Sequence, residues 1–402
     1  MREASKSSRC MVLLVLMLAV PVARADSWDL PTTKSYLSPD KTWRFTVTPR
    51  AVAGPLAYFQ DKVAGRKDAG ALPGNLQKRA QGFMEHRVHG HWQAAWNRQL
   101  LNEVSPVSAV VSPSGQVATF DNWFGNGIGD DVVVIYGRNG RLVRAMALKD
   151  FLPARYVDAL PRSVSSIWWG GDHHFSADGR RLILSVVVPD EKMAEALVDA
   201  KAARIELAFD TSSGKELAPP EPAWSRAVAQ ADQVDAALHA AEARREAVFV
   251  APLRAPHGDA DVDWHRYLAE AFFRIDPDWE NGYPATKVLR LPQRKDYAAS
   301  VGFLRDALHK ELYRHGVTMI ASPSQDNLVR VLARLAAGVP HGWLRDVRIY
   351  VAVDDAHTAA VARALAPTGA RYVQLNPDIA IPQRRQRLDA MRAEKQRNGS
   401  EP

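Results

Sequence analysis

Three histidines lie within six residues of one another in the segment Glu85–Trp92. The imidazole nitrogens of His86, His89 and His91 are ligands that zinc and copper accept, so this trio is a candidate metal site. On a regular strand, however, His89 and His91 share one face and His86 points to the other, so the three converge only if the chain bends at Gly90. A solvated strand or loop is the alternative interpretation.

A second candidate site combines aromatic rings with histidines in the run Trp168–His174. The paired tryptophans can form a stacking wall for a ligand, and either histidine can exchange protons near pH 7. The competing interpretation places the rings over the end of a β core and the histidines at the start of a hairpin strand. The candidate ligand-binding residues of this run are Trp168, Trp169, Asp172, His173 and His174. No catalytic residue is assigned, because no serine, carboxylate pair or second base stands at a diagnostic spacing.

A third candidate site is the glycine-rich loop Asp121–Asp131, which contains several hard oxygen donors. Calcium requires such donors on a flexible backbone, although the spacing here fits no calcium-hand motif. Asp121 and Trp123 are further candidate ligand contacts. A long connection between two strands has the same composition, so both interpretations stay open. Whether this loop meets Trp168–His174 in a shared pocket is a question for the structure.

Two aspartates, Asp354 and Asp355, stand between a predicted strand and a predicted helix, with His357 close behind. Ligands of parallel sheets bind at that edge, but an aspartate before a helix is also a common N-cap, which is the interpretation we favour. The usual signatures of hydrolases and nucleotide-binding proteins are missing: the chain has no Gly-x-Ser-x-Gly, no His-Glu-x-x-His and no glycine-rich phosphate loop before a helix.

The N-terminal half repeats one local pattern, in which an apolar residue, a serine, a proline or alanine and a turn pair precede a strand-like run. The copies are Leu37-Ser38-Pro39-Asp40-Lys41 before Trp43–Val47, Val111-Ser112-Pro113-Ser114-Gly115 before Val117–Phe120, and Phe175-Ser176-Ala177-Asp178-Gly179 before Leu182–Val186. Proline presets a turn, Asp and Ser bond their own backbone, and Gly adopts positive φ. Each copy therefore predicts a tight turn between two strands.

These copies resemble the β-propeller repeats of exported bacterial proteins, such as the periplasmic protein of the Tol system, whose blades carry Ser-Pro-Asp-Gly between strands. The resemblance covers roughly Tyr36–Leu217. Serine-to-serine spacings of 74 and 64 residues exceed the roughly 40 to 50 of a blade, so we expect a partial propeller or a twisted sandwich. This half is also similar to a set of uncharacterised exported bacterial proteins with the runs Thr119–Trp123 and Val132–Tyr136, which implies no activity.

The composition changes after Pro219–Pro222, and strands and helices then alternate. We expect a helical connector at 219–247, an α/β domain at 248–380 and a basic, frayed helical tail at 381–402. The predicted strands are Val248–Val250, Val288–Leu291, Val317–Ala321, Val347–Val353 and Tyr372–Leu375. The predicted helices are Trp264–Phe273, Tyr297–Leu312, a helix capped by Ser324, and Ala359–Ala366. Such alternation is typical of a parallel sheet.

The first 25 residues have the pattern of an export signal, with three basic residues before the apolar run Met11–Val20 and the small-x-small sequence Ala23-Arg24-Ala25 at the end. The apolar core is too short for the roughly 20 residues of a membrane span. We expect its removal, which places the protein in the periplasm or outside the cell without a membrane span. The one cysteine, Cys10, would leave with it, so thiol catalysis and disulfides are excluded.

The basic charge of the chain lies mainly at its two ends. The formal net charge is +7, and loss of the leader, with four basic residues and one acidic residue, leaves +4 for the residues from 26 on. The tail from Ile381 onward carries six basic and three acidic residues, so the body at 26–380 is nearly neutral. A nucleic-acid-binding protein would instead cluster Lys and Arg over one face, so this class is excluded.

Together these patterns predict an α+β protein, with a β-rich repeat domain at 26–218 followed by the α/β domain. Our leading hypothesis is a non-enzymatic binding or scaffold module of the bacterial envelope, whose partner is an envelope protein or a small ligand. No cofactor is predicted, and zinc and calcium are the candidates if there is one. The alternative is a metal-assisted hydrolase that uses His86, His89 and His91, or an inter-domain site near His173 and His174.

Overall fold

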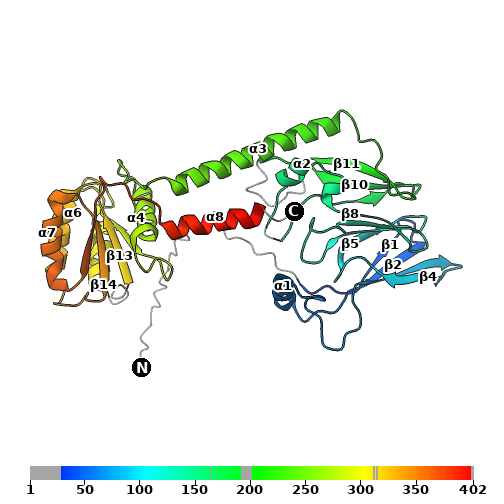
Figure 1. The fold of residues 1–402 in the computed structure, drawn as a ribbon, viewed down its shortest axis with the longest axis horizontal. Coiled ribbons are helices and arrows are strands. Elements are labelled where there is room, and N and C mark those ends of the chain that lie inside the picture. Colours follow the sequence, from blue (N-terminus) through cyan, green and yellow to red (C-terminus); the bar gives the residue numbers. More distant parts are fainter. Residues whose placement is uncertain (1–28, 164, 192–201, 311–312, 314–315, 400–402) are drawn as a thin grey trace, which may run out of the picture. The chain divides into compact units, whose positions relative to one another are not determined.

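The computed structural model describes residues 29–163, 165–191, 202–310, 313 and 316–399 (Figure 1). The predicted leader therefore lies outside the described residues. The chain divides into two compact units, residues up to Ala240 and residues from Ala241 onward. The first contains antiparallel sheets and the second a parallel sheet with helices, which confirms the predicted α+β class.

In its described residues, the first unit contains three antiparallel sheets, each built from strands that are consecutive in the chain. The strands are β1 (Lys34–Leu37), β2 (Trp43–Thr48), β3 (Gln81–Val88) and β4 (His91–Gln99), then β5 (Pro106–Val111), β6 (Val117–Asn122), β7 (Val133–Tyr136) and β8 (Leu142–Met146), then β9 (His174–Phe175), β10 (Arg181–Val187) and β11 (Arg204–Asp210). The first strands of successive sheets contact each other, β1 with β5 and β5 with β9.

The three serine segments form the predicted turns, and each joins the first and second strands of its sheet. The carbonyl oxygen of each serine accepts an N–H from the third residue after it, at 2.8 to 3.1 Å. The serine Oγ also accepts a backbone N–H at the entry to the second strand, from Trp43, Gln116 or Arg181. The residue that donates to the carbonyl has positive φ in all three turns: Lys41, Gly115 and Gly179.

The turn glycines also pack against the preceding sheet. A Cβ at Gly115 would lie 2.8 Å from the ring of Trp43, and a Cβ at Gly179 would collide with the side chain of Ser114. Both contacts are too close for a side chain, so glycine is needed for space as well as for its positive φ. The first turn has no preceding sheet and tolerates Lys41 at the same place.

The cores of the first unit lie between neighbouring sheets. Trp43 and Phe45 of the first sheet pack with Val134 and Tyr136 of the second. The second and third sheets share a larger core that is covered by the 3-10 turn η1 (Leu148–Asp150), by α2 (Ala154–Ala159) and by the first turns of α3 (Ala223–Val250). A smaller cluster around Tyr58 fixes α1 (Pro55–Val63) to the loop that follows β6.

The described part of the second unit contains one parallel sheet with the strand order β12 (Ala285–Val288), β13 (Gly316–Ala321), β14 (Val347–Ala352) and β15 (Arg371–Leu375). Its helices are α4 (Asp261–Ile275), α5 (Tyr297–His309), α6 (Gln325–Ala336), α7 (Asp355–Leu365), the 3-10 turn η4 (Ala366–Thr368) and α8 (Arg385–Gly399). Helices α5, α6 and α7 share one core with the sheet, and α4 packs in a separate core. Because the strands follow each other in chain order, the sheet has no point at which the strand order reverses, where doubly wound sheets bind ligands.

Three local expectations differ from the structure. The strand expected at Val288–Leu291 lies earlier in the chain, since β12 ends at Val288. Val248–Val250 was expected to be a strand but forms the end of α3, because the Ala- and Glu-rich run before it continues in the helix without interruption. The basic tail was expected to be frayed, but its start is held in place: Arg384 donates to the carbonyl oxygens of Phe273 and Asp276, and Arg387 pairs with Glu270.

None of the helices in the described part of the chain is both long enough and apolar enough to cross a membrane.

Candidate functional site

The structure brings together the loops Asp121–Asp131 and Trp168–His174. Trp169 donates its ring N–H to Asp121 Oδ1 at 2.8 Å, and the backbone N–H of Gly127 donates to the same oxygen at 2.7 Å. Asp121 has φ 58°, a left-handed conformation that aspartate tolerates better than most residues. Trp169 is 2% exposed and belongs to the core between the second and third sheets.

His173 lies between two aromatic rings. Its ring centroid is 4.5 Å from that of Trp169 and 4.4 Å from that of Phe120, and its Nδ1 accepts the backbone N–H of Ser185 at 3.1 Å. Burial lowers the pKa of His173 to about 3, so the ring is neutral at physiological pH. Burial also raises the pKa of Asp121 to about 6. The contact between the two loops is thus a packed stack with a neutral imidazole rather than an open pocket.

The other members of these two runs lie around this stack. Trp168 is half-buried, and Asp172 and His174 are exposed. Trp123 is buried and donates its ring N–H to the carbonyl oxygen of Asp29 at 2.7 Å. The rings of Trp168–His174 therefore cover the end of the β core, as the competing interpretation of this run expected, and His174 begins β9.

The three histidines of the first candidate site occupy a hairpin. His86 is on β3 and stacks on Trp43 with a centroid distance of 4.2 Å. His89 and Gly90 are the two central residues of the turn, with φ 48° and 85°, and His91 begins β4. This is the geometry of a type I′ turn. Within the described residues, no group of three or more His, Cys, Asp or Glu side chains is arranged to hold a metal ion.

Asp354 is the N-cap of α7, as the sequence predicted. Its carboxylate accepts the backbone N–H of His357 at 3.1 Å and lies 2.6 Å from Nδ1 of the same residue. The Nε2 of His357 is 2.9 Å from Asp326 at the start of α6. Hydrogen bonds to Asp326 and Asp354 raise the pKa of His357, so this cluster links two helix N-termini when the imidazole is protonated.

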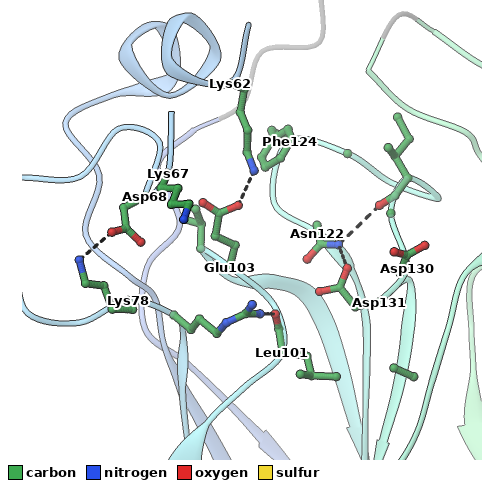
Figure 2. A pocket seen from close by; sticks show the side chains of 16 residues that line it. Lys62, Lys67, Asp68, Lys78, Leu101, Glu103, Asn122, Phe124, Asp130 and Asp131 are labelled. Atoms are coloured by element: carbon green, nitrogen blue, oxygen red, sulfur yellow. Dashed lines mark hydrogen bonds and ion pairs between the residues drawn. The ribbon is translucent and has the colours of Figure 1, made fainter. Parts of the chain in front are cut away.

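A cavity of about 860 Å³ opens beside these loops in the first unit, and we call it the charged groove (Figure 2). It lies between the connection from β2 to β3, which includes α1, and the loop from β6 to β7. Its apolar lining includes Leu101, Val104 and Phe124. Its charged lining residues are Lys62, Lys67, Asp68, Lys78, Arg79, Glu103, Asp130 and Asp131.

One wall of the charged groove is predominantly basic. Lys62 pairs with Glu103 at 2.6 Å, and Lys78 pairs with Asp68 at 2.7 Å (Figure 2). Arg79 donates to the carbonyl oxygen of Leu101 but forms no ion pair with a described carboxylate, and Lys67 forms no hydrogen bond or ion pair with a described residue, although its charge acts on Asp68. Among the described residues, this wall therefore retains two cations that form no ion pair.

The opposite wall carries Asp130 and Asp131. Asn122 donates its amide N–H to Asp131 at 2.6 Å (Figure 2), and burial raises the pKa of Asp131. Asp130 is exposed and makes no hydrogen bond or ion pair within the described ranges. Two carboxylates thus lie across the charged groove from the two unpaired cations.

Glu103 anchors the floor of the basic wall. Its carboxylate accepts from Arg50 at 3.2 Å, from the hydroxyl of Tyr58 at 3.1 Å and from Lys62. Arg50 is 1% exposed and also donates to the carbonyl oxygen of Ala69 at 2.8 Å. Burial and the neighbouring Glu103 carboxylate raise the pKa of Tyr58. This network holds α1 and the segment after it against the sheets.

Most of the charged groove was missed by sequence reasoning. The loop Asp121–Asp131 was identified, although Asp121 itself is turned toward Trp169 and the lining comes from later residues of the loop. The basic wall comes from the segment between β2 and β3, to which the sequence assigned no role. The one available signal was the concentration of Lys62, Lys67, Lys78 and Arg79 in a nearly neutral body.

No protein-family model matches the sequence, and no curated protein matches it either.

Proposed function

We propose that this protein is a non-enzymatic binding module exported to the bacterial envelope and that its ligand occupies the charged groove. The observation that carries the proposal is a cavity of about 860 Å³ whose two walls keep unpaired charges of opposite sign. Ligand pockets have volumes of roughly 300 to 1,000 Å³ and orient their ligands with a few polar groups. The export part of the proposal depends on the leader at residues 1–25.

The way the walls are supported favours binding. Both walls are loops inserted between strands of rigid sheets, and such loops often carry binding residues. The Asp121–Trp169 hydrogen bond fixes the base of one wall, and the Glu103 network fixes the base of the other. Three consecutive antiparallel sheets whose first strands are neighbours also support the proposed kinship with propeller-like repeats of exported proteins.

The places of the histidines favour binding over metal-assisted hydrolysis. His86 stacks on Trp43, and His173 is enclosed between two rings with its Nδ1 already accepting a backbone N–H. A general base must reach the proton that it removes, and the two ring contacts and the occupied Nδ1 place His173 poorly for this role.

A single introduced cysteine tests the proposal, because the chain from residue 26 onward contains no other thiol. Ile128 lines the charged groove and is 43% exposed, whereas Leu142 is 38% exposed outside it. Ile128→Cys and Leu142→Cys would each carry an environment-sensitive fluorophore. We expect the low-molecular-weight fraction of a bacterial envelope extract to change the emission of the first conjugate alone. No change in either conjugate, or equal changes in both, would count against a ligand in the charged groove.

A further inference from the structure

We infer that the ligand of the charged groove is a short peptide with both termini free, whose carboxylate lies at Lys67 and Arg79 and whose ammonium lies at Asp130 and Asp131. This inference rests on the proposed function and adds the chemical class of the ligand. It follows from the charges that stay unpaired, from their separation onto two walls and from the size and lining of the cavity.

The charged groove contains eight ionisable side chains, four basic and four acidic. Two pairs neutralise each other within the basic wall, Lys62 with Glu103 and Lys78 with Asp68. The four groups left over are two cations and two carboxylates, which have no net charge together. A ligand that satisfies all four must also be neutral overall and must carry both signs of charge.

The unpaired groups are separated onto two walls and form no ion pair with each other among the described residues. Lys67 and Arg79 come from the connection between β2 and β3. Asp130 and Asp131 come from the loop between β6 and β7, and Figure 2 shows them across from Lys67. Burial raises the pKa of Asp131, and the hydrogen bond from Asn122 and, more weakly, the charge of Arg79 oppose this increase. Arg79 and Asp131 therefore interact at a distance without forming an ion pair. The charged groove therefore has a dipole across it, which a zwitterion of the opposite orientation would complement.

Ligands with one sign of charge fit less well. A dianion held by Lys67 and Arg79 would face the carboxylates of Asp130 and Asp131, and a dication at those carboxylates would face the two cations. Like charges placed opposite each other oppose binding and thereby confer specificity.

The cavity is also large for a single amino acid. Its volume of about 860 Å³ lies near the upper end of the range for ligand pockets. The lining also includes the apolar residues Leu101, Val104 and Phe124, which suit the side chains of a peptide. A peptide of a few residues can span the two walls and fill this space.

Calorimetric titration of the chain from residue 26 onward with tetra-alanine tests the inference. The two comparison probes are the same peptide with an acetylated N-terminus and with an amidated C-terminus. We expect the free peptide to bind, and each cap to weaken binding by about tenfold to a hundredfold, because each cap removes one set of charge-assisted hydrogen bonds.

Two variants assign the ends of the peptide to the walls. Lys67→Gln should reduce the loss of affinity caused by amidation several-fold and leave the loss caused by acetylation unchanged. Asp130→Asn should reduce the loss caused by acetylation and leave the loss caused by amidation unchanged. Both residues are exposed and unpaired within the described chain, so the fold should tolerate these changes. Lys149→Gln and Asp232→Asn, at exposed positions outside the charged groove, are the matched controls and should change neither loss.

The outcomes separate this inference from the proposed function. If succinate or putrescine binds and tetra-alanine does not, or if the caps do not weaken binding, the zwitterion assignment is wrong and a binding site remains. If the Ile128→Cys conjugate also fails to respond to the envelope fraction, the proposed function is wrong as well. Reversed effects of Lys67→Gln and Asp130→Asn would refute the assigned orientation.

Discussion

The opposite pKa shifts of Asp121 and His173 predict that two pH effects on stability cancel in this protein. The pKa of Asp121 is raised to about 6 from an ordinary value of 3.8, so between these values the folded chain holds a proton that the unfolded chain has lost. Acidification over this interval therefore stabilises the fold through Asp121. The pKa of His173 is lowered to about 3 from 6.5, so between these values the unfolded chain binds a proton that the folded chain does not bind. Acidification destabilises the fold through His173.

Each group changes the free energy of unfolding by about 1.4 kcal/mol per pH unit in the range where its folded and unfolded forms differ by one proton. Between pH 6 and pH 4 the two contributions have opposite signs and similar size. Asp121→Asn keeps an oxygen acceptor for Trp169 and Gly127 but removes the titration, so only the effect of His173 remains. Between pH 6 and pH 4 this variant should lose about 3 kcal/mol more of its free energy of unfolding than the wild type does.

The assay is urea denaturation at pH 4, 5, 6 and 7, with the difference between variant and wild type plotted against pH so that the other titrating groups cancel. His173→Asn should give the opposite slope, with a gain of about 3 kcal/mol over the same interval. The slope is the readout, because the loss of ring stacking lowers the stability of this second variant at every pH. Flat difference curves for both variants would refute the assigned protonation states.

Close packing at the serine turns predicts that Gly115→Ala lowers the free energy of unfolding by about 1 to 3 kcal/mol more than Gly90→Ala does. Both glycines have φ near 85°, but only a Cβ at Gly115 would collide with Trp43. Urea denaturation measures the difference, and equal losses would contradict the packing argument. The carboxylates around His357 raise its pKa, so its ion pairs stabilise the fold below pH 6.5 and this contribution is lost as the pH rises through the raised value. His357→Gln should therefore reduce the change in the amide protection factors of α6 and α7 between pH 6 and 8. Protection factors with the same pH profile as in the wild type would count against the cluster. The leader predicts that protein recovered from the periplasm of an expressing bacterium begins at Asp26, and mass spectrometry that finds an intact N-terminus would overturn the export proposal.

Elements with a local cause were predicted well from the sequence. The helix at Tyr297 follows from apolar residues at spacings of three and four, and the cap at Asp354 follows from an acceptor placed just before a helix. The strand expected at Val248–Val250 was wrong, because three apolar residues are too few to separate a buried strand from the end of a helix that is already formed. Ser324 occupies the N-cap position of α6, but its side chain makes no capping bond.

The candidate site shows the same limit of prediction from local sequence patterns. Trp169 and Asp121 were both selected from the sequence, but their hydrogen bond joins residues 48 positions apart, and it turns a proposed ligand wall into a packed contact between loops. Sequence spacing indicates which side chains can do chemistry. It does not indicate which of them other parts of the chain will cover.

The sequence by itself determined the serine turns, the alternation of strands and helices in the second half and the class of the fold, because these depend on hydrogen bonds and apolar periodicities within a few residues. Only the tertiary structure decided that Lys67 and Arg79 face Asp130 and Asp131 across a cavity. The two walls come from separate loops, and their positions depend on the packing of three sheets and on contacts such as Trp169 with Asp121 and Tyr58 with Glu103. Those contacts form between residues far apart in the chain, and no local pattern encodes them.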